Sequence, residues 1–466
     1  MDIGILSAFI IYFGTLLGIG FYFYHTKRNT ASFMLGGRST NYLVTAIAAQ
    51  ASDMGAWLFL GFPAAIYMTG TSGSWIAIGL VLFMFLDWHY IAPKLRTYTE
   101  QLNSLTLSSF FAARFGDTNG HIRLMSALFS LLFFTFYIAS GLVGLGRLFE
   151  SAFELNYHAG ILLGLLITTI FTLVGGFIAV AWSNLFQGLF LLIVIVLVPL
   201  YAFGMIDGLH AIVTAAHARN ISLSLITDTH GIGNALNMMA WGLGYFGQPH
   251  ILIYFMGIND VRKMHYAKYI GMAWQIVVLA AAIAIGLVGI AFFNQGLSNP
   301  ELLFILMTKT LFHPILVGFI FCAILAAIIS SLSSQILLSG SIVAEDLYKE
   351  FIDVTTSQQQ LVWITRISAL AICLVSLGIA WNDSNSVFNL VSYAWSGLGS
   401  AFGPLVIAAL YLPRTTHAGA LVSMLVGGWF AALWPYIQST DIMPIVPGFF
   451  AGLITIIGVS YMTHKR

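Results

Sequence analysis

The chain has 466 residues, of which 59% are hydrophobic and only 8% are charged, and its mean hydropathy is +0.91. This composition excludes an ordinary water-soluble domain and indicates a polytopic, all-α membrane protein. A formal net charge of +1 argues against an extended basic surface for nucleic acid, and Cys322 and Cys373 both lie in apolar segments, which argues against a disulfide framework or a thiolate metal site.

The apolar segments set the number of helices. A hydrocarbon layer about 30 Å thick is crossed by about 20 helical residues, and the chain divides into thirteen segments of that length or longer. We predict transmembrane helices over residues 3–25, 41–68, 74–93, 122–150, 157–175, 177–203, 232–257, 266–293, 314–344, 359–381, 386–412, 416–436 and 443–463. The first segment lacks a basic leader and a clear cleavage site, so we expect a retained helix and not a signal peptide.

The distribution of lysine and arginine predicts the orientation. If the thirteen segments alternate across the membrane, Arg147, Arg219 and Lys309 fall on one side and the other basic residues, including Lys27, Arg28, Lys465 and Arg466, on the opposite side. Basic residues collect in cytoplasmic loops. The amino terminus is therefore expected outside and the carboxyl terminus in the cytoplasm.

The second segment carries a carboxylate, Asp53, in its middle. An ionisable group at membrane depth is costly and is usually tolerated only where it faces a cavity that uses it. Ala51, Ser52, Gly55 and Ala56 surround it, and these small residues favour a local break in the helix. Carbonyls released at such a break can hold an ion.

The seventh segment is interrupted in a similar way, five helices further along the chain. It contains Gly242, Gly244, Gly247 and Pro249, which lower the cost of unwinding and remove a backbone donor. Two broken helices in corresponding positions of two five-helix halves predict an inverted-repeat secondary transporter with its sites between them.

The ninth segment places adjacent hydroxyls, Ser330 and Ser331, near its middle, and Ala327 lies one turn earlier on the same face. Two hydroxyls and three backbone carbonyls would form a neutral oxygen cage that suits a monovalent cation better than a divalent one. The alternative has equal weight: these serines bond back to their own helix or join two helices.

A set of motifs resembles the solute:sodium symporter family, and within it most closely the branch that transports proline. Eight motifs carry the resemblance in the family's order and spacing: Leu35-Gly-Gly-Arg-Ser39, Ala51-Ser-Asp-Met54, Phe134-Thr-Phe-Tyr-Ile-Ala-Ser-Gly141, Gly175-Gly-Phe-Ile-Ala-Val-Ala-Trp182, Tyr245-Phe-Gly-Gln-Pro-His250, Ser330-Ser-Leu-Ser-Ser-Gln335, Glu345-Asp-Leu-Tyr348 and Gly397-Leu-Gly-Ser-Ala-Phe-Gly-Pro404.

The resemblance implies the leucine-transporter type of fold, in which ten core helices form two inverted five-helix repeats. Residues 1–30 would form a peripheral first helix, residues 31–205 the first repeat, residues 206–412 the inverted second repeat, and residues 413–466 two peripheral helices. The thirteen predicted segments agree with this division.

The resemblance also implies site residues. Sodium would be bound by Ala51, Met54, Ala327, Ser330 and Ser331, and Asp53 would serve sodium coupling, either by touching the ion or by shaping the helix break. The implied substrate-binding positions are Gly55, Ala56, Trp57, Tyr137, Trp241, Tyr245 and Pro249. Arg38 would gate the cytoplasmic exit or, equally, act as a cytoplasmic anchor.

These positions suit a zwitterionic imino acid. Amides at an unwound helix end can receive its carboxylate, and aromatic walls can receive its ring and its secondary ammonium. Aromatic residues make up 14% of the chain, however, so most of them pack or anchor helices instead of contacting substrate.

Some residues depart from the pattern of the proline branch or lie outside it. Gly55-Ala56 replaces a usual Ser-Gly pair, which could change the substrate. Ser331 stands where threonine is common but keeps the hydroxyl, so sodium binding is little affected. Asn184 replaces an acid, which could weaken sodium binding or alter the coupling ion. We expect Asp87 to pair with a nearby basic residue close to the inner end of its helix. His89 and His250 are expected to be wet interfacial residues, and Glu345 and Asp346 to form a network at the inner rim.

The sequence therefore predicts a sodium-coupled symporter that imports a small organic solute, proline first, by alternating access, with one sodium ion per substrate. The alternatives are a symporter of the same fold for a carboxylate, vitamin or sugar, and a solute sensor without turnover; an enzyme is not expected because no catalytic constellation is present. We expect Na⁺ as coupling ion with no organic cofactor, lipid as surroundings, no nucleic-acid partner, a monomer, and a bacterial inner (plasma) membrane location.

Overall fold

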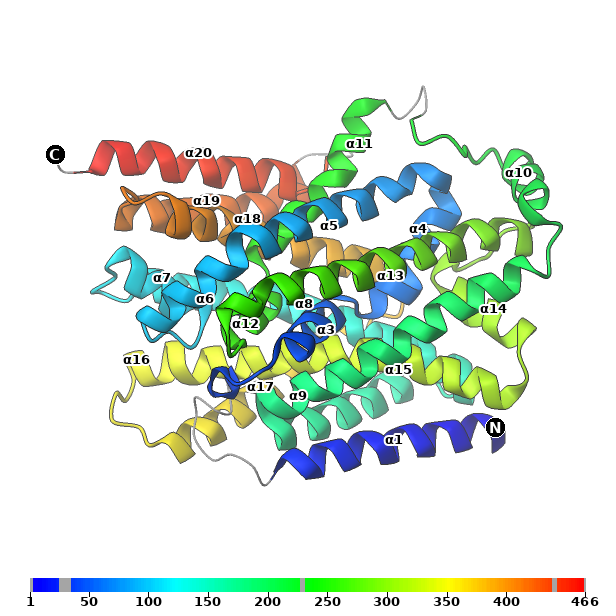
Figure 1. Ribbon diagram of the computed structural model, residues 1–466, viewed down its shortest axis with the longest axis horizontal. Coiled ribbons are helices and arrows are strands. Elements are labelled where there is room, and N and C mark those ends of the chain that lie inside the picture. Colours follow the sequence, from blue (N-terminus) through cyan, green and yellow to red (C-terminus); the bar gives the residue numbers. More distant parts are fainter. Residues whose placement is uncertain (1–2, 25–34, 227–230, 438–441, 465–466) are drawn as a thin grey trace.

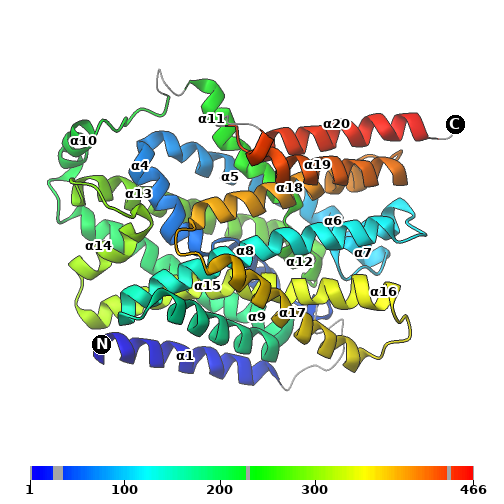
Figure 2. The same cartoon turned by 180° about the vertical axis from the view of Figure 1, so that it is seen from behind.

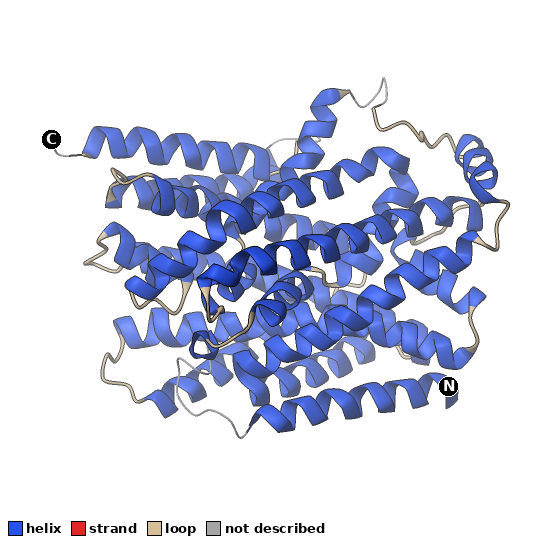
Figure 3. Ribbon diagram, viewed as in Figure 1, coloured by secondary structure: helices blue, strands red, loops and turns tan. Residues whose placement is uncertain are grey.

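All regular elements of the described chain are helices. The computed structural model describes residues 3–24, 35–226, 231–437 and 442–464, and within these ranges no strand forms apart from one isolated bridge between Thr40 and Ile258 (Figure 3). Backbone groups in hydrocarbon must find their hydrogen bonds within the chain, which a helix does locally. The all-α prediction is confirmed.

The first half of the chain contains α-helices and short helical turns (η) that are either tighter or wider than an α-helix. They are α1 (Ile3–Tyr24), η1 (Gly36–Arg38), α3 (Tyr42–Asp53), η2 (Trp57–Gly61), α4 (Phe62–Thr69), η3 (Gly70–Gly73), α5 (Ser74–Leu86), η4 (Asp87–Ile91), α6 (Ala92–Gln101), α7 (Leu107–Phe115), α8 (His121–Phe153), α9 (Tyr157–Phe203) and α10 (Gly208–Ala218).

The second half continues in the same manner. Its elements are α11 (Ile232–Met239), η5 (Ala240–Gly247), α12 (Pro249–Gly257), η6 (Val261–Lys263), α13 (Met264–Phe292), η7 (Pro300–Leu302), α14 (Leu303–Leu311), α15 (Pro314–Ser341), η8 (Ile342–Tyr348), α16 (Lys349–Phe351), α17 (Gln358–Ala380), α18 (Val387–Tyr411), α19 (His417–Ile437) and α20 (Ile445–Thr463).

The number of membrane crossings is a separate question. Among the described residues, nine helical segments are long and apolar enough to cross a membrane, and two shorter apolar helices are Ile3–Leu16 and Tyr157–Thr172. The longest of the nine, Trp57–Gln101, includes Gly70, whose φ of +69° ends α4 and turns the chain toward α5. The count of thirteen stays a prediction.

The predicted boundary between the fifth and sixth segments coincides with a backbone irregularity in α9. Gly176 interrupts this helix with φ 64° and ψ −175°, a conformation that residues with a side chain rarely adopt. The prediction divided the chain at the same residue.

Most of the long helices run along one common direction, and the two ends of the drawn chain lie at opposite ends of the bundle (Figures 1 and 2). Helices α19 and α20 pack together along one edge, and α1 lies along the opposite edge against α15 and α9. The most buried membrane-length helices are α15 and α18, so these form the centre of the bundle. The basic residues Lys27, Arg28, Lys465 and Arg466 lie outside the described residues.

Candidate functional site

The second predicted segment is broken at the expected place. Helix α3 ends at Asp53, and Met54 leaves the helical conformation with φ −83° and ψ 66°. The amide of Gly55 donates to the Asp53 carbonyl (2.9 Å), and helical structure resumes at Trp57. A Cβ at Gly55 would lie 2.9 Å from the Ser331 hydroxyl, so the close approach of α15 requires a residue without a side chain or a shift of that serine. The predicted break is confirmed.

Helix α15 meets this break through Ser330. Its hydroxyl lies 2.8 Å from the Ala51 carbonyl oxygen of α3 and 2.9 Å from the Ala327 carbonyl oxygen of its own helix. The neighbouring Ser331 hydroxyl accepts a hydrogen bond from the Gln335 amide (3.1 Å). The structure thus gathers these four predicted sodium positions where α3 and α15 touch, with Met54 in the adjoining break. Ser330 thus bonds back to α15 and also joins it to α3, which is the alternative interpretation of these serines, and the sodium cage stays a prediction.

Asp53 faces the other broken segment and not α15. Its side chain is fully buried, and one carboxylate oxygen accepts from the Tyr245 hydroxyl at 2.6 Å. The same hydroxyl accepts from the Gln275 amide of α13 (2.9 Å). The second carboxylate oxygen of Asp53 has no hydrogen-bond partner among the described residues. A buried carboxylate therefore connects the break after α3 to η5.

The second broken segment takes a specific form: a tight helical turn, η5, then an extended residue, Gln248 (φ −89°, ψ 100°), and then α12. Pro249 is the first residue of α12, where its missing amide hydrogen costs nothing. Proline thus starts a helix here, and the unwinding precedes it.

Aromatic side chains pack in a row beside this centre. The ring centroids of Trp57 and Trp241 are 6.4 Å apart, and those of Trp241 and Phe388 are 5.1 Å apart. Trp395 supports this row through two contacts: its indole N–H donates to the Trp241 carbonyl (2.7 Å), and its ring packs edge-on against Tyr245. Trp57 is held to the break itself, since its indole N–H donates to the Asp53 carbonyl (3.1 Å).

Tyr137 and His250 form a second aromatic contact, with ring centroids 5.3 Å apart. Both are buried, and neither the Tyr137 hydroxyl nor either ring nitrogen of His250 has a hydrogen-bond partner among the described residues. The expectation that His250 is a wet interfacial residue is wrong, because α12 begins one residue earlier and lies inside the bundle. His89, by contrast, is exposed and lies 3.2 Å from the Lys268 ammonium. Ala56, the remaining predicted substrate position, is buried against Gly144 of α8.

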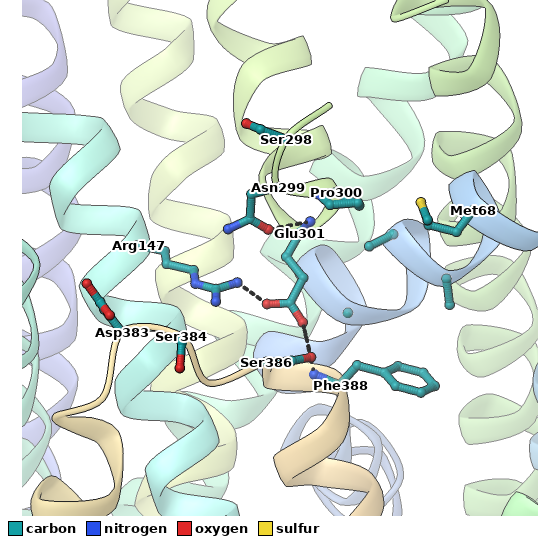
Figure 4. A pocket seen from close by; sticks show the side chains of 13 residues that line it. Met68, Arg147, Ser298, Asn299, Pro300, Glu301, Asp383, Ser384, Ser386 and Phe388 are labelled. Atoms are coloured by element: carbon teal, nitrogen blue, oxygen red, sulfur yellow. Dashed lines mark hydrogen bonds and ion pairs between the residues drawn. The ribbon is translucent and has the colours of Figure 1, made fainter. Parts of the chain in front are cut away.

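A vestibule of about 520 Å³ lies beyond Phe388 (Figure 4). Arg147 of α8 reaches across it to form a largely buried ion pair with Glu301. The Glu301 carboxylate also accepts from the Ser386 hydroxyl (2.8 Å) and from the amides of Val387 and Phe388 (3.2 and 3.1 Å). It therefore caps the first turn of α18, where amide donors are otherwise unpaired.

The opposite end of the bundle contains Arg38. Its guanidinium donates to the carbonyls of Met256, Thr99 and Ser104 at 2.8 to 2.9 Å, which joins the end of α12 to α6 and the following loop. Burial and the nearby Arg96 lower the pKa of Arg38 to about 10, so the side chain stays charged at neutral pH. The contacts fit either predicted role, gate or anchor.

A network around η8 lines a second cavity of about 400 Å³ at this end. The Thr106 hydroxyl donates to Asp346 (2.9 Å), Lys349 pairs with Glu345 (2.8 Å), and Arg123 pairs with Glu350. Glu345 and Asp346 thus take part in a polar network, as predicted, and its place at the inner rim stays a prediction.

Asn184 is fully buried beside Ser330, where its amide contacts the Tyr254 hydroxyl (2.9 Å) and the Ser334 hydroxyl (3.2 Å). One further expectation needs revision. Asp87 lies midway along the continuous helical segment Ser74–Gln101, and neither of its oxygens has a hydrogen-bond partner among the described residues. The helix runs past residue 93, where the prediction ended it, and no basic partner of Asp87 is found in the described chain.

Several site residues escaped the sequence reasoning. Gln275, Trp395 and Phe388 carry no local signal, because an amide or aromatic residue in an apolar helix looks like packing. Arg147 and Glu301 did carry one: each is an ionisable residue beside a long apolar segment. The pairing of the two required the fold.

A bundle of apolar helices with a buried polar centre between two interrupted segments defines a secondary transporter, an integral membrane protein. Residues 33–427 match the model described as Sodium:solute symporter family, and the chain belongs to this family. Because the family consists of symporters, the expectation of a transporter and not an enzyme is confirmed.

The relatives have the following names and coverage. The chain is 42% identical over 456 residues to the high-affinity proline transporter PutP of Bacillus subtilis (strain 168), with 96% of each chain covered. It is 41% identical over 472 residues to sodium/proline symporter 2 of Staphylococcus saprophyticus, with 98% of this chain and 92% of the relative covered. Its fold matches a Na⁺-coupled sialic acid symporter in a substrate-bound outward-open state with a TM-score of 0.84 at 17% identity, over 99% and 98% of the two chains. The predicted leucine-transporter type of fold is confirmed.

Proposed function

We propose that this protein imports proline together with sodium by alternating access. The observation that carries the proposal is the Ser330 hydroxyl, which lies within hydrogen-bond distance of the Ala51 carbonyl on α3 and the Ala327 carbonyl on α15. It concentrates oxygen ligands at the break of α3, directly beside Gly55 and Trp57. The names of the two relatives, a proline transporter and a sodium/proline symporter, support the choice of solute and ion.

The sodium site would use the carbonyls of Ala51, Met54 and Ala327 with the hydroxyls of Ser330 and Ser331. All five residues are buried, and all five ligands are neutral oxygens. A neutral cage favours a monovalent cation, because a divalent ion normally recruits carboxylates. On binding sodium, the Ser330 hydroxyl would turn its hydrogen away from the carbonyls and offer its oxygen, so that the ion takes over the link between α3 and α15.

The proline site would lie beside it, between Trp57, Tyr245 and Trp241. Backbone amides freed at Gly55 and Ala56 can receive the substrate carboxylate, and the aromatic row can enclose the pyrrolidine ring. Tyr137 would add a hydroxyl whose hydrogen-bonding capacity is unused within the described chain. Pro249 would hold the turn from η5 into α12 in place. Asp53, through its hydrogen bond to Tyr245, would link the aromatic residues of the proline site to the conformation of the break after α3.

Coupling follows from reciprocity. If sodium and proline stabilise the same arrangement of α3, η5 and α15, each raises the affinity of the other by the same factor. We further propose one sodium per proline, and the membrane potential then contributes about 2.3 kcal/mol per 100 mV for that charge.

The remaining parts of the proposal concern topology and surroundings. Residues 31–205 and 206–412 would be the two inverted repeats, residues 1–30 and 413–466 the peripheral parts, and the protein a monomer in the lipid of a bacterial inner membrane. The amino terminus would lie outside, which places the Glu301 vestibule outside and Arg38, as gate, at the cytoplasmic exit. The excess of lysine and arginine on the side that carries the carboxyl terminus supports this orientation.

Proteoliposomes test the proposal. An inward sodium gradient should drive accumulation of labelled proline, and replacing sodium with choline should abolish it. Unlabelled proline should compete at the lowest concentration in a panel that includes small carboxylates, sugars and other amino acids. Undiminished uptake in choline would refute sodium coupling, and stronger competition by another solute would replace proline as the substrate.

A further inference from the structure

A second buried carboxylate lies apart from the proposed sodium site. Asp87 begins η4, a widened helical turn between α5 and α6, and its side chain is fully buried. Neither carboxylate oxygen has a hydrogen-bond partner in the part of the chain that the structure describes. Widened turns of this kind occur often at functional sites. The proposed transport cycle leaves this group unused.

Buried polar side chains lie close to η4. The next residue, Trp88, is buried with its indole N–H unpaired, and this nitrogen lies 3.5 Å from the point where a Cβ on Gly271 of α13 would lie. The Gln50 amide nitrogen lies 3.3 Å from the same point. Hydrogen bonds connect Gln50 to Gln275, Gln275 to Tyr245, and Tyr245 to Asp53. An unpaired N–H is a donor and cannot bind a metal ion.

Positive groups near η4 are engaged elsewhere. The turn packs against α5, α6, α13, α18 and η5, and the Trp88 ring also contacts the tilted ring of Phe255 on α12. The ionisable side chains on η4 and these elements are His89, Tyr90, Lys94, Arg96, Tyr98, Glu100, Tyr245, His250, Tyr254, His265, Tyr266, Lys268, Tyr269, Tyr393 and Tyr411.

The three cations among them have their own partners. Lys94 lies over the Tyr411 ring at 3.6 Å, Arg96 pairs with Glu100 and donates to the Ile258 carbonyl, and Lys268 lies beside His89. No ion pair in the described chain includes Asp87. An ionised carboxylate without a counter-charge or a hydrogen bond at membrane depth is strongly disfavoured.

We propose that Asp87 is a proton-binding site and that the transporter carries this proton as a second coupling ion. In the arrangement described here the carboxyl group is neutral. It takes its proton from water on the outer side and returns it to water on the inner side when the cycle hydrates η4, so the step moves one proton and forms no other bond. A proton needs only one oxygen of Asp87, whereas a sodium ion needs several oxygen ligands, and the carboxylate has no hydrogen-bond partner in the described chain.

Transport in a pH gradient tests the proposal. With equal sodium on both sides and the voltage clamped to zero, an acidic exterior (pH 6 outside, pH 7.5 inside) should drive accumulation of labelled proline by the native protein. Asp87→Asn, which imitates the neutral carboxyl, should lose this response and keep uptake driven by a sodium gradient. Asp207→Asn, at an exposed acid, is the matched control and should behave like the native protein. A native protein that ignores the pH gradient, or an Asp87→Asn variant that still responds, overturns the proposal.

A second measurement does not depend on the solute. If the native state holds a proton that the unfolded chain releases, the unfolding equilibrium constant gains a factor of ten per pH unit from this group. Between pH 6 and pH 8, unfolding of the native protein in mixed micelles should therefore increase at least tenfold more than unfolding of Asp87→Asn, with Asp207→Asn like the native protein. Equal pH dependence in native protein and Asp87→Asn would refute proton binding. The transport experiment rests on the proposed function, whereas the unfolding experiment does not. Failure of proline uptake and failure of this inference are therefore distinguishable.

Discussion

Removal of the Ser330 hydroxyl is the sharpest test of the proposed ion site. In Ser330→Ala, the link from α15 to the Ala51 carbonyl is lost, and with it one of the five oxygens proposed to bind sodium. Interactions with a charged partner are worth about 1.5–3 kcal/mol each. A loss of about 2 kcal/mol corresponds to roughly 30-fold weaker sodium binding, since every 1.4 kcal/mol is tenfold.

Equilibrium binding of labelled proline to purified protein, titrated with sodium, measures this effect. The half-saturating sodium concentration should rise by roughly 30-fold, while proline binding at saturating sodium recovers toward the native level. The latter result separates a lost ion ligand from a damaged proline site.

Ser341→Ala is the matched control. Ser341 is a buried serine of the same helix whose hydroxyl donates to the Leu337 carbonyl one turn earlier (2.8 Å). It should leave the sodium dependence unchanged. If Ser330→Ala also leaves it unchanged, Ser330 does not bind the ion and the proposed cage is wrong.

Three further predictions concern the packing around the site. Tyr245→Phe leaves a buried carboxylate oxygen of Asp53 without its donor, so thermal unfolding should show a loss of about 1–3 kcal/mol, and proline uptake should fall; an unchanged melting temperature would contradict a stabilising hydrogen bond. Arg147→Ala and Glu301→Ala each leave a largely buried charge alone and should each cost about 3–5 kcal/mol, and the double variant should cost less than the sum, whereas strict additivity would argue against coupling. Gly242→Ala places a Cβ 2.3 Å from the Gly79 carbonyl oxygen and should impair folding, as measured by the yield of monodisperse protein, whereas Gly233→Ala meets open space and should match the native yield.

The sequence was sufficient for the broken helices because their causes are local. Gly55 permits the approach of α15, and Gly242 and Gly244 permit that of α5 and Trp395, and each carries its signature in the residue type itself. The boundary at Gly176 was predictable for the same reason. The continuation of α5 through η4 to Gln101 was not, since Pro93 and the charged residues after it suggested an end, although proline is well tolerated in the first turn of α6.

The site was predictable to a lesser degree. Family motifs identified Ala51, Ala327 and Ser330, which the fold brings together, but contacts between distant segments have no local signature. The hydrogen bond from Tyr245 to Asp53 and the capping of α18 by Glu301 join residues far apart in the chain. The partner of Asp87 and the burial of His250 were misjudged because hydropathy reports whether a segment enters the membrane and not which face of it meets other helices.

The position of Glu301 has a consequence for movement at the vestibule. The same carboxylate neutralises Arg147 and completes the hydrogen bonding of the first turn of α18. Any displacement that widens this end of the bundle by withdrawing Glu301 must uncover a cation, a serine hydroxyl and two amide hydrogens together. Water entering the vestibule is then needed to replace the carboxylate at four groups at once, so the barrier to opening depends on how readily that space fills with solvent.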